Sequence, residues 1–124
     1  MKLLIVDDSS AVYRRLIELL GGVESLTALA VARTLREAQE KCRSFKPDAV
    51  VLDLELPDGS GLEAIASLKS VEPPPCVCIF SNRVDRRSQA LALGADSFYD
   101  KSLEFENLVR ALRGFTPVEG PKHA

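Results

Sequence analysis

The chain has 124 residues, of which 46% are hydrophobic and 27% are charged, and its formal net charge is −2. This length suits one domain with one core, and the small negative charge argues against the basic surface of nucleic-acid-binding proteins. No apolar run reaches the ~18 residues of a membrane span, and the N-terminal apolar run is too short for a secretory signal. We therefore expect one cytoplasmic domain that binds neither nucleic acid nor membrane directly.

Apolar runs alternate with helical patterns along the chain. Strands are expected at residues 3–6, 26–32, 48–53, 76–81 and 96–101, and helices in the intervals after each, ending with a helix over 103–112. The first, third and fourth strands are continuous apolar runs, as in a parallel sheet covered by helices on both faces. With right-handed crossovers, this pattern predicts a doubly wound (βα)5 three-layer α/β sandwich.

Local signals support this reading of the elements. Ser9 or Ser10 is expected to cap the first helix, and Thr34, with Glu37 three residues later, to cap the second. Cys76 and Cys78 should share one face of the fourth strand, where they cannot bridge each other easily. No cysteine–histidine zinc spacing is present, so we expect reduced structural thiols.

A charged or hydroxyl residue stands at the carboxyl end of the first, third, fourth and fifth predicted strands. Asp7 and Asp8 follow the first strand, Asp53 and Ser81 end the third and fourth, and Lys101 follows the fifth. In doubly wound sheets, ligands bind at the carboxyl ends of the strands. Each residue alone has an ordinary role as a cap, turn or surface residue, but together they predict a site.

The residue types at this edge indicate phosphoryl chemistry. Three carboxylates close together repel one another, and Mg²⁺, which takes oxygen ligands, would relieve that repulsion. Lys101 and Ser81 would stabilise charge on a transferred phosphoryl group. Asp53 is the expected nucleophile, because aspartyl phosphates are a known covalent intermediate.

Four segments, "LLIVDDS", "PDAVVLDLELPDGSGLEAI", "IFSN" and "GADSFYDKS", resemble the receiver domains of two-component response regulators. The resemblance covers about residues 2–113. It implies a flavodoxin-like sheet with strand order 2-1-3-4-5, a domain over residues 1–114, and a flexible tail or start of a linker over 115–124.

The resemblance also implies roles at the acidic end of the site. Asp7 and Asp8 match the metal-binding pair, and Asp53 matches the phosphoacceptor, which also contacts the metal. Glu55 matches the residue whose backbone carbonyl binds the metal. The implied cofactor is Mg²⁺, and the implied phosphodonor is a sensor histidine kinase or a phosphotransfer protein.

Three further positions match the switch residues of the family. Ser81 matches the hydroxyl that contacts the phosphoryl group, and Lys101 matches the lysine that pairs with it. Phe98 matches the aromatic switch, here without a hydroxyl, and the adjacent Tyr99 should point to the other face of its strand. The switch would act on the face formed by the fourth helix, fifth strand and fifth helix, which binds a downstream protein or a missing output domain.

The chain departs from the family pattern at the rim of the site. Asn82 stands where Ala or Gly is usual and would narrow access to the acceptor. Ser102 stands where a cis proline usually follows the lysine, so this loop is either trans and reshaped or strained. A Glu55–Arg83 pair across the site would screen the acceptor from water and, with Asn82, tune the phosphoryl lifetime.

Other readings remain open at this point. A pseudo-receiver would be an interaction module that takes no phosphate, and a haloacid-dehalogenase-like phosphatase would carry its aspartate after the first strand instead of the third. We expect self-phosphorylation and dephosphorylation without enzymatic turnover, and a stand-alone receiver in preference to one cut from a longer regulator. A homodimer through the output face is expected if Phe105 and Leu112 are partly exposed.

Overall fold

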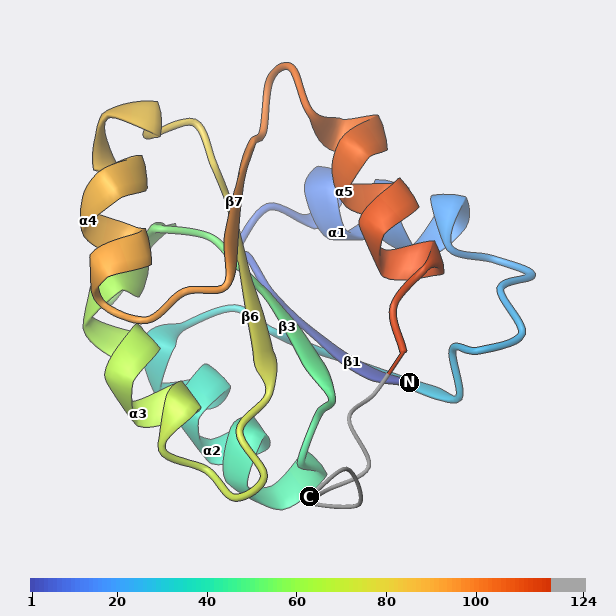
Figure 1. Cartoon of the computed structure of the whole chain (residues 1–124), viewed down its shortest axis with the longest axis horizontal. Helices are drawn as coiled ribbons and strands as arrows, with labels where there is room; N and C mark the ends of the chain where they lie inside the picture. The colour runs from blue at the N-terminus through green and yellow to red at the C-terminus, as the bar shows by residue number, and fades with distance from the viewer. Residues whose placement is uncertain (117–124) are drawn as a thin grey trace, which may run out of the picture.

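The computed structural model describes residues 1–116 of the chain and contains a five-stranded parallel sheet between two layers of helices (Figure 1). The strands of this sheet are β1 (Lys2–Val6), β2 (Ala28–Ala32), β3 (Ala49–Leu52), β6 (Cys76–Ser81) and β7 (Ser97–Asp100). Their order is β2-β1-β3-β6-β7, and every pair is parallel. The predicted order 2-1-3-4-5 is confirmed, since β6 and β7 are the fourth and fifth predicted strands.

Helices cover both faces of the sheet. One face carries α1 (Ser10–Leu19) and α5 (Phe105–Arg113), and the other carries α2 (Leu35–Phe45), α3 (Ile65–Lys69) and α4 (Arg87–Ala92). Short 3₁₀ turns, η1 (Gly61–Ala64) and η2 (Val84–Arg86), precede α3 and α4. The three-layer sandwich is therefore present as predicted, with third and fourth helices that are shorter than the sequence pattern indicates.

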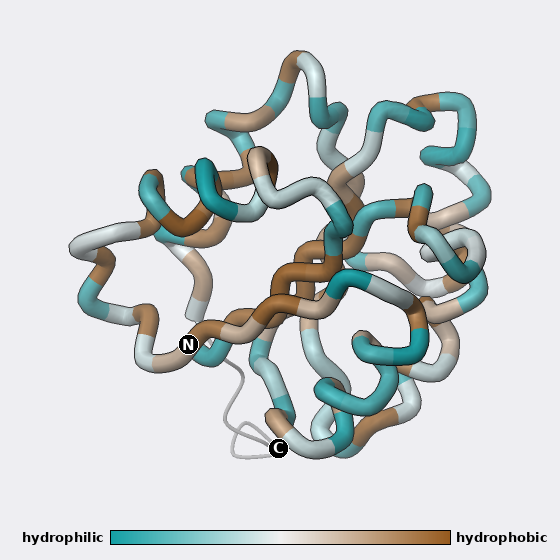
Figure 2. Tube along the Cα trace, turned by 180° about the vertical axis from the view of Figure 1, so that it is seen from behind, coloured by the Kyte–Doolittle hydropathy of each residue, from teal (hydrophilic) through white to brown (hydrophobic). Residues whose placement is uncertain are grey.

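Each face of the sheet builds its own hydrophobic cluster. Along β1, Leu4 and Val6 pack with α2, α3 and α4, whereas Leu3 and Ile5 pack with α1 and α5. All four side chains are fully buried. Figure 2 shows the hydrophobic trace gathered in the central strands, which explains why these strands are continuous apolar runs in the sequence.

Strand β7 also divides its side chains between the two clusters. Phe98 belongs to the cluster under α2, α3 and α4, and Tyr99 packs against the other cluster, as the strand period requires. Cys76 and Cys78 likewise share one face of β6, with both thiols free and their Sγ atoms 4.0 Å apart. Both strand-face predictions are confirmed.

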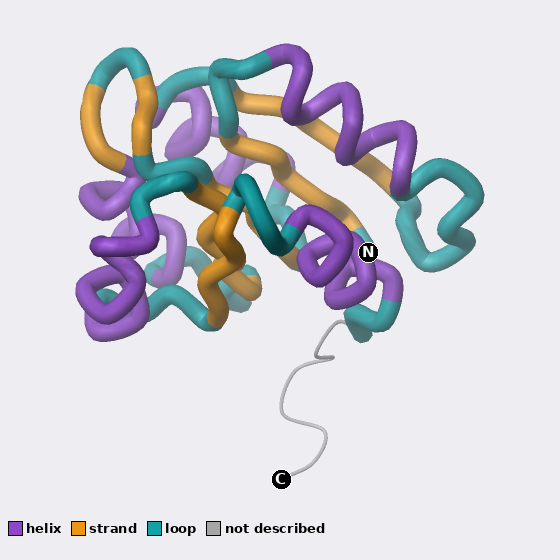
Figure 3. The backbone as a smooth tube through the Cα atoms, turned by 90° about the horizontal axis from the view of Figure 1, so that it is seen from above, coloured by secondary structure: helices purple, strands orange, loops and turns teal. Residues whose placement is uncertain are grey.

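One small element was predicted only as a turn. Residues 55–60 form an antiparallel hairpin of β4 (Glu55–Leu56) and β5 (Gly59–Ser60), which Figure 3 shows as a small orange pair at upper left. Two-residue strands carry no detectable period in a sequence, so only the turn residues between them gave a signal. This hairpin follows β3 directly and borders the site described below.

The ends of the elements agree with the capping signals. The Ser9 hydroxyl accepts a hydrogen bond from the Val12 amide (3.4 Å), and the Thr34 hydroxyl accepts one from the Glu37 amide (3.0 Å). Phe115 packs against the α1/α5 cluster, and the rest of the predicted tail, from residue 117, lies outside the described residues. Within residues 1–116, no helix combines the length and the apolar character needed to cross a membrane.

Candidate functional site

The backbone ladder carries three site residues to one edge of the sheet. Figure 3 views the molecule from the side where these strands end. One residue past each strand, the Asp7 amide donates to Ala32 O (3.0 Å), the Asp53 amide to Val6 O (2.9 Å) and the Lys101 amide to Ser81 O (3.0 Å). The side chains are therefore placed by the sheet itself, because main-chain bonds to neighbouring strands fix their positions.

Lys101 connects two of the carboxylates. Its Nζ lies 2.7 Å from Asp7 Oδ2 and 3.1 Å from Asp53 Oδ2, and its side chain is only 12% exposed. Burial pushes the pKa of Lys101 downward, but the hydrogen bond to Asp7 and the charge of Asp53 outweigh burial and raise that pKa above its ordinary value. Lys101 is therefore a firmly charged ammonium held between two buried acids.

The carboxylates of Asp7, Asp8 and Asp53 converge, with one oxygen of each within 4.8 Å of the others. Asp7 and Asp53 are buried, and Asp8 is exposed. Burial raises the pKa of Asp53, Lys101 lowers it, and nearby Asp7 raises it again, for a net upward shift. One lysine against three carboxylates leaves an excess of negative charge, and an all-oxygen donor set fits a hard divalent cation such as Mg²⁺.

The backbone around Asp53 is tightly enclosed. Asp53 Oδ1 accepts a long hydrogen bond from the Glu55 amide (3.3 Å), while Oδ2 faces Lys101. At Gly61 a Cβ atom would lie 2.1 Å from the Asp53 carbonyl oxygen, so only glycine fits there. The hairpin after β3 therefore passes directly against the main chain of the predicted acceptor.

Ser81 lies at the same edge with its hydroxyl turned toward its own loop. The side chain is fully buried, and Oγ accepts a hydrogen bond from the Arg83 amide (3.1 Å). Because the hydroxyl accepts in this bond, its own hydrogen remains available to donate to a group on Asp53.

The two residues that depart from the family pattern contact each other. The Ser102 hydroxyl lies 2.7 Å from Asn82 Oδ1, to which it donates, and the Ser102 amide donates to Asp100 Oδ1 (2.8 Å). Within residues 1–116, the cis peptide bond is Glu72–Pro73, so the Lys101–Ser102 bond is trans. Of the two alternatives for this loop, the reshaped trans loop is present, and the strained cis alternative is wrong.

Arg83 has a different partner from the predicted one. Its guanidinium makes two hydrogen bonds with the Asp85 carboxylate, Nε to Oδ1 (3.0 Å) and Nη2 to Oδ2 (2.9 Å). A direct Glu55–Arg83 ion pair is not among the interactions of the described residues. The reason is local: Asp85 is two residues away on the same 3₁₀ turn and matches the fork of the guanidinium.

The aromatic switch position has an arginine above it that the sequence did not indicate. The Arg87 guanidinium carbon lies 4.8 Å from the ring centroid of Phe98, which is 5% exposed. Arg87 Nη2 also lies 3.4 Å from Glu104 Oε1, which accepts a hydrogen bond from the Asp100 amide. The start of α4, strand β7 and the loop before α5 are thus joined through one side chain.

Asp58, at the tip of the hairpin, is a second residue that the sequence reading missed. Its Oδ1 accepts a hydrogen bond from the Leu35 amide (2.8 Å), and its Oδ2 accepts one from the Arg36 amide (3.1 Å). These bonds hold the pKa of Asp58 below its ordinary value. The "LPDG" quartet indicated a turn, and nothing in that signal placed the turn against α2.

The condition stated for a homodimer is only half met. Phe105 is partly buried and packs edge-on against Phe80, with ring centroids 5.0 Å apart, but Leu112 is 1% exposed. Leu112 therefore belongs to the core and gives no apolar surface for a partner, and dimerisation remains a prediction.

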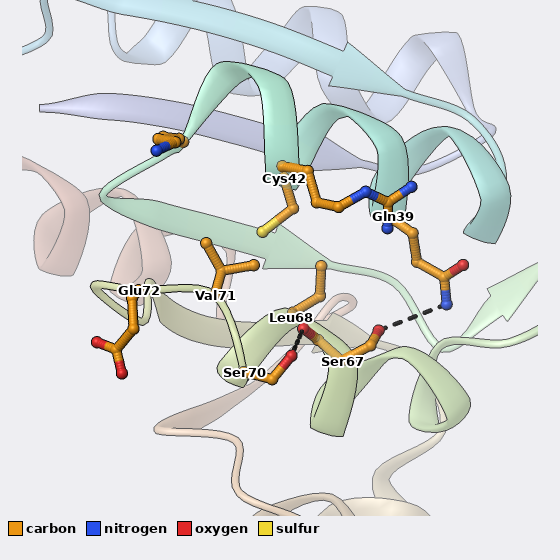
Figure 4. Close-up of a pocket in the computed structure, with 9 residues that line it drawn as sticks. Gln39, Cys42, Ser67, Leu68, Ser70, Val71 and Glu72 are labelled. Atoms are coloured by element: carbon orange, nitrogen blue, oxygen red, sulfur yellow. Dashed lines mark hydrogen bonds between the residues drawn. The ribbon is translucent and has the colours of Figure 1, made fainter.

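A groove between α2 and α3 lies apart from the strand ends (Figure 4). Part of its polar lining is internally paired: Gln39 Nε2 donates to Ser67 Oγ (3.4 Å), and the Ser70 hydroxyl donates to the Ser67 carbonyl (2.7 Å). This groove includes none of the predicted site residues.

Comparison with known families identifies the family of this chain. The model of the response regulator receiver domain matches residues 3–113. The chain belongs to the response regulator receiver domain family. It is similar to the response regulator domain of Thermotoga maritima CheB, with 27% identity, a TM-score of 0.77 and 90% of each chain covered.

Curated relatives of this receiver domain are longer proteins. A protein-glutamate methylesterase/protein-glutamine glutaminase of Vibrio parahaemolyticus is 34% identical over 89% of this chain and 30% of its own length. The DNA-binding transcriptional activator DevR/DosR of Mycobacterium tuberculosis is 33% identical over 91% of this chain and 53% of its own length. The chain thus spans about a third to half of these relatives, whose names describe the whole proteins.

Proposed function

We propose that this receiver domain accepts a phosphoryl group on Asp53 from the phosphohistidine of a sensor histidine kinase or a phosphotransfer protein. The observation that carries this proposal is the position of Lys101, which lies within 3.1 Å of both Asp7 and Asp53 at the edge where three carboxylates converge. An acceptor carboxylate must be ionised and next to positive charge. Lys101 supplies that charge on one side, and the acids Asp7 and Asp8 would supply it on the other by holding a metal ion.

Asp7, Asp8 and Asp53 would hold Mg²⁺, together with the Glu55 backbone carbonyl. The cation would supply positive charge to the phosphoryl oxygens and offset the repulsion among the three acids. Asp53 would react as a carboxylate paired with Lys101, whose Nζ lies 3.1 Å away and lowers the pKa that burial raises, without cancelling the upward shift.

In the transfer step, an Asp53 carboxylate oxygen bonds to phosphorus while the phosphorus–nitrogen bond to the donor histidine breaks. The electron pair of that bond returns to the imidazole. Lys101 then redirects its ammonium toward the new phosphoryl oxygens, and the Ser81 hydroxyl, which accepts from the Arg83 amide, donates its own hydrogen to another of them. Each of these contacts forms only when Asp53 is phosphorylated. Phosphorylation would therefore shift the population toward the conformation in which these contacts are made.

The output would follow from the helix to which the Ser81 loop leads, since α4 begins at Arg87. Phe98 lies beneath Arg87 on β7, and Arg87 also reaches Glu104 before α5. A movement of Ser81 would repack Phe98 and alter the face of α4, β7 and α5, which we propose as the contact for a downstream protein or an output domain. The chain would modify only its own aspartate, without turnover of a substrate, and would act in the cytoplasm with its three thiols reduced.

Acetyl phosphate and Mg²⁺ provide a direct test of the acceptor. The wild-type chain should gain the ~80 Da of one phosphoryl group on intact-mass spectrometry, as aspartyl chemistry requires, and Asp53→Asn should gain none. Asp48→Asn, at the opposite edge of the sheet, is the matched control and should gain the same mass as wild type. A phosphorylated Asp53→Asn would show that the acceptor is a different residue, and an unmodified wild type that binds no Mg²⁺ would favour the pseudo-receiver reading.

A further inference from the structure

The β4–β5 hairpin that follows Asp53 is too short to hold its own shape. Each strand has two residues, and Glu55 pairs with Ser60 across it. Isolated hairpins are marginal even when their strands are longer. Because Glu55 is the proposed source of the metal-binding carbonyl, the position of this hairpin sets the position of one metal ligand.

The base of the hairpin is fixed by local contacts. The Gly61 amide donates to Leu54 O (2.8 Å), and the Ser60 amide donates to Glu63 Oε2 (2.9 Å) in a capping box at the start of η1. These bonds hold the two ends where the hairpin leaves the sheet. They do not reach its tip, the Pro57–Asp58 turn.

The tip is fixed by α2. Asp58 accepts the Leu35 and Arg36 amides through separate oxygens, at 2.8 and 3.1 Å. Gly59 packs against the same helix, since a Cβ there would lie 2.8 Å from Leu35 Cδ1, and its φ of +149° disfavours other residues. Two independent contacts therefore attach the hairpin tip to the first turn of α2.

The cap on α2 is shared between two residues with separable roles. Thr34 takes the Glu37 amide, and Asp58 takes the first two amides of the helix. Thr34 belongs to the chain leading into α2, and among residues 1–116 its hydroxyl bonds within that helix and makes no hydrogen bond to the hairpin. The two residues thus cap one helix, but only Asp58 links it to the acceptor loop.

We infer that Asp58 is a positioning residue for the metal site. Its bonds to α2 hold the hairpin, and with it the Glu55 carbonyl, in place for a divalent cation, and we call this link between the hairpin and α2 the splint. The inference rests on the proposed function, because it assigns the splint to the same Mg²⁺ site. Outer partners that orient metal ligands typically change metal affinity by 10–100-fold when removed. An indirect link of this kind should act at the lower end of that range.

The test compares Asp58→Ala with Thr34→Ala in the full chain. Mn²⁺ binding is measured by the loss of the free-ion electron paramagnetic resonance signal, and thermal unfolding by circular dichroism. Both variants should unfold at a lower temperature than wild type, because both remove a cap of α2. Only Asp58→Ala should bind Mn²⁺ about 10-fold more weakly, and Asp58→Asn, which keeps acceptor oxygen but no charge, should lie between it and wild type.

The outcomes separate this inference from the proposed function. Equal Mn²⁺ affinity in Asp58→Ala, Thr34→Ala and wild type would overturn the splint and leave Asp58 as a helix cap. Equally weakened binding in both variants would also overturn it, since general loosening of α2 would then explain the effect. A wild-type chain that binds no Mn²⁺ would instead overturn the proposed metal site on which the splint depends.

Discussion

Aspartates stand at both edges of the sheet, but their hydrogen-bond and ion-pair partners differ between the edges. At the amino edge, Asp96 Oδ2 accepts from the Val77 amide (2.7 Å) and Lys69 Nζ (2.8 Å), and Asp48 accepts from the Lys2 amide (2.6 Å). At the carboxyl edge, Asp7 and Asp53 share Lys101, and Asp8 lies beside them.

The difference lies in where the donors come from. At the amino edge, each aspartate accepts a backbone amide from another strand and so ties two parts of the sheet together. At the carboxyl edge, Asp7 and Asp53 accept amides two residues along their own segment, from Ser9 and Glu55, and share the cation of Lys101. Acids held this close repel each other, so they gain from an added cation. The residue type alone therefore does not mark a functional site, and the crowding of several acids around one cation does.

Replacing the lysine at each edge, Lys101 or Lys69, should produce the largest difference in the free energy of unfolding between the edges. Without metal, Lys101→Met should lower the free energy of unfolding by about 3 kcal/mol, because it leaves buried carboxylates without a cation. Saturating Mg²⁺ should restore about 2–3 kcal/mol of that loss through binding to the folded state. Urea unfolding with EDTA and with Mg²⁺ measures both effects.

Lys69→Met is the matched control at the amino edge. Its partner Asp96 is partly exposed, so the loss should be about 1 kcal/mol, and Mg²⁺ should restore none of it. Restoration by Mg²⁺ in both variants would erase the distinction between the edges.

Removing the amino-edge acid should be the next largest effect. Asp96→Ala should cost about 2 kcal/mol, because the Val77 amide and Lys69 lose a charged hydrogen-bond partner. The midpoint of thermal unfolding in EDTA measures this loss. An unchanged midpoint would mean that water replaces the carboxylate at no cost and that this edge is not held by its acids.

Removing the charge of an acid at the carboxyl edge should change the stability in the opposite direction. Asp53→Asn should raise the free energy of unfolding in EDTA by about 1 kcal/mol, a usual gain when a strained functional charge is removed. The upward shift in the pKa of Asp53, caused by burial and by Asp7, gives the sign: the charged form is disfavoured in the folded state. A less stable Asp53→Asn would show that the bond to Lys101 outweighs the repulsion.

The smallest effect is expected at the rim of the carboxyl edge. Asn82→Ala removes the side chain to which Ser102 donates and which we propose narrows access to the acceptor, so water should reach Asp53 more easily. One ordinary hydrogen bond contributes ~0.5–1.5 kcal/mol, so phosphoryl loss should be about 2–10-fold faster. Ser102→Ala should act in the same direction, measured as decay of the phosphorylated mass after donor removal. A longer lifetime in both variants would reverse the role assigned to this pair.

The sequence by itself determined the fold and the residues delivered to the carboxyl edge. Continuous apolar strands require cover on both faces, and the residue after each strand is placed by main-chain bonds such as Asp53 N to Val6 O. Strand position and side-chain alternation are strong periodic signals, so the sequence places Asp7, Asp53, Ser81 and Lys101 at one edge of the sheet.

Only the tertiary structure decided how side chains in the loops pair. Arg83 bonds Asp85 instead of Glu55, Ser102 bonds Asn82 across a trans peptide, and Asp58 caps α2 from a hairpin 22 or 23 residues away. Such pairings differ from their alternatives by about 1 kcal/mol and depend on loop paths that leave no period in the sequence. The strand ends are encoded along the chain, whereas the contacts that adjust them arise only when distant loops meet.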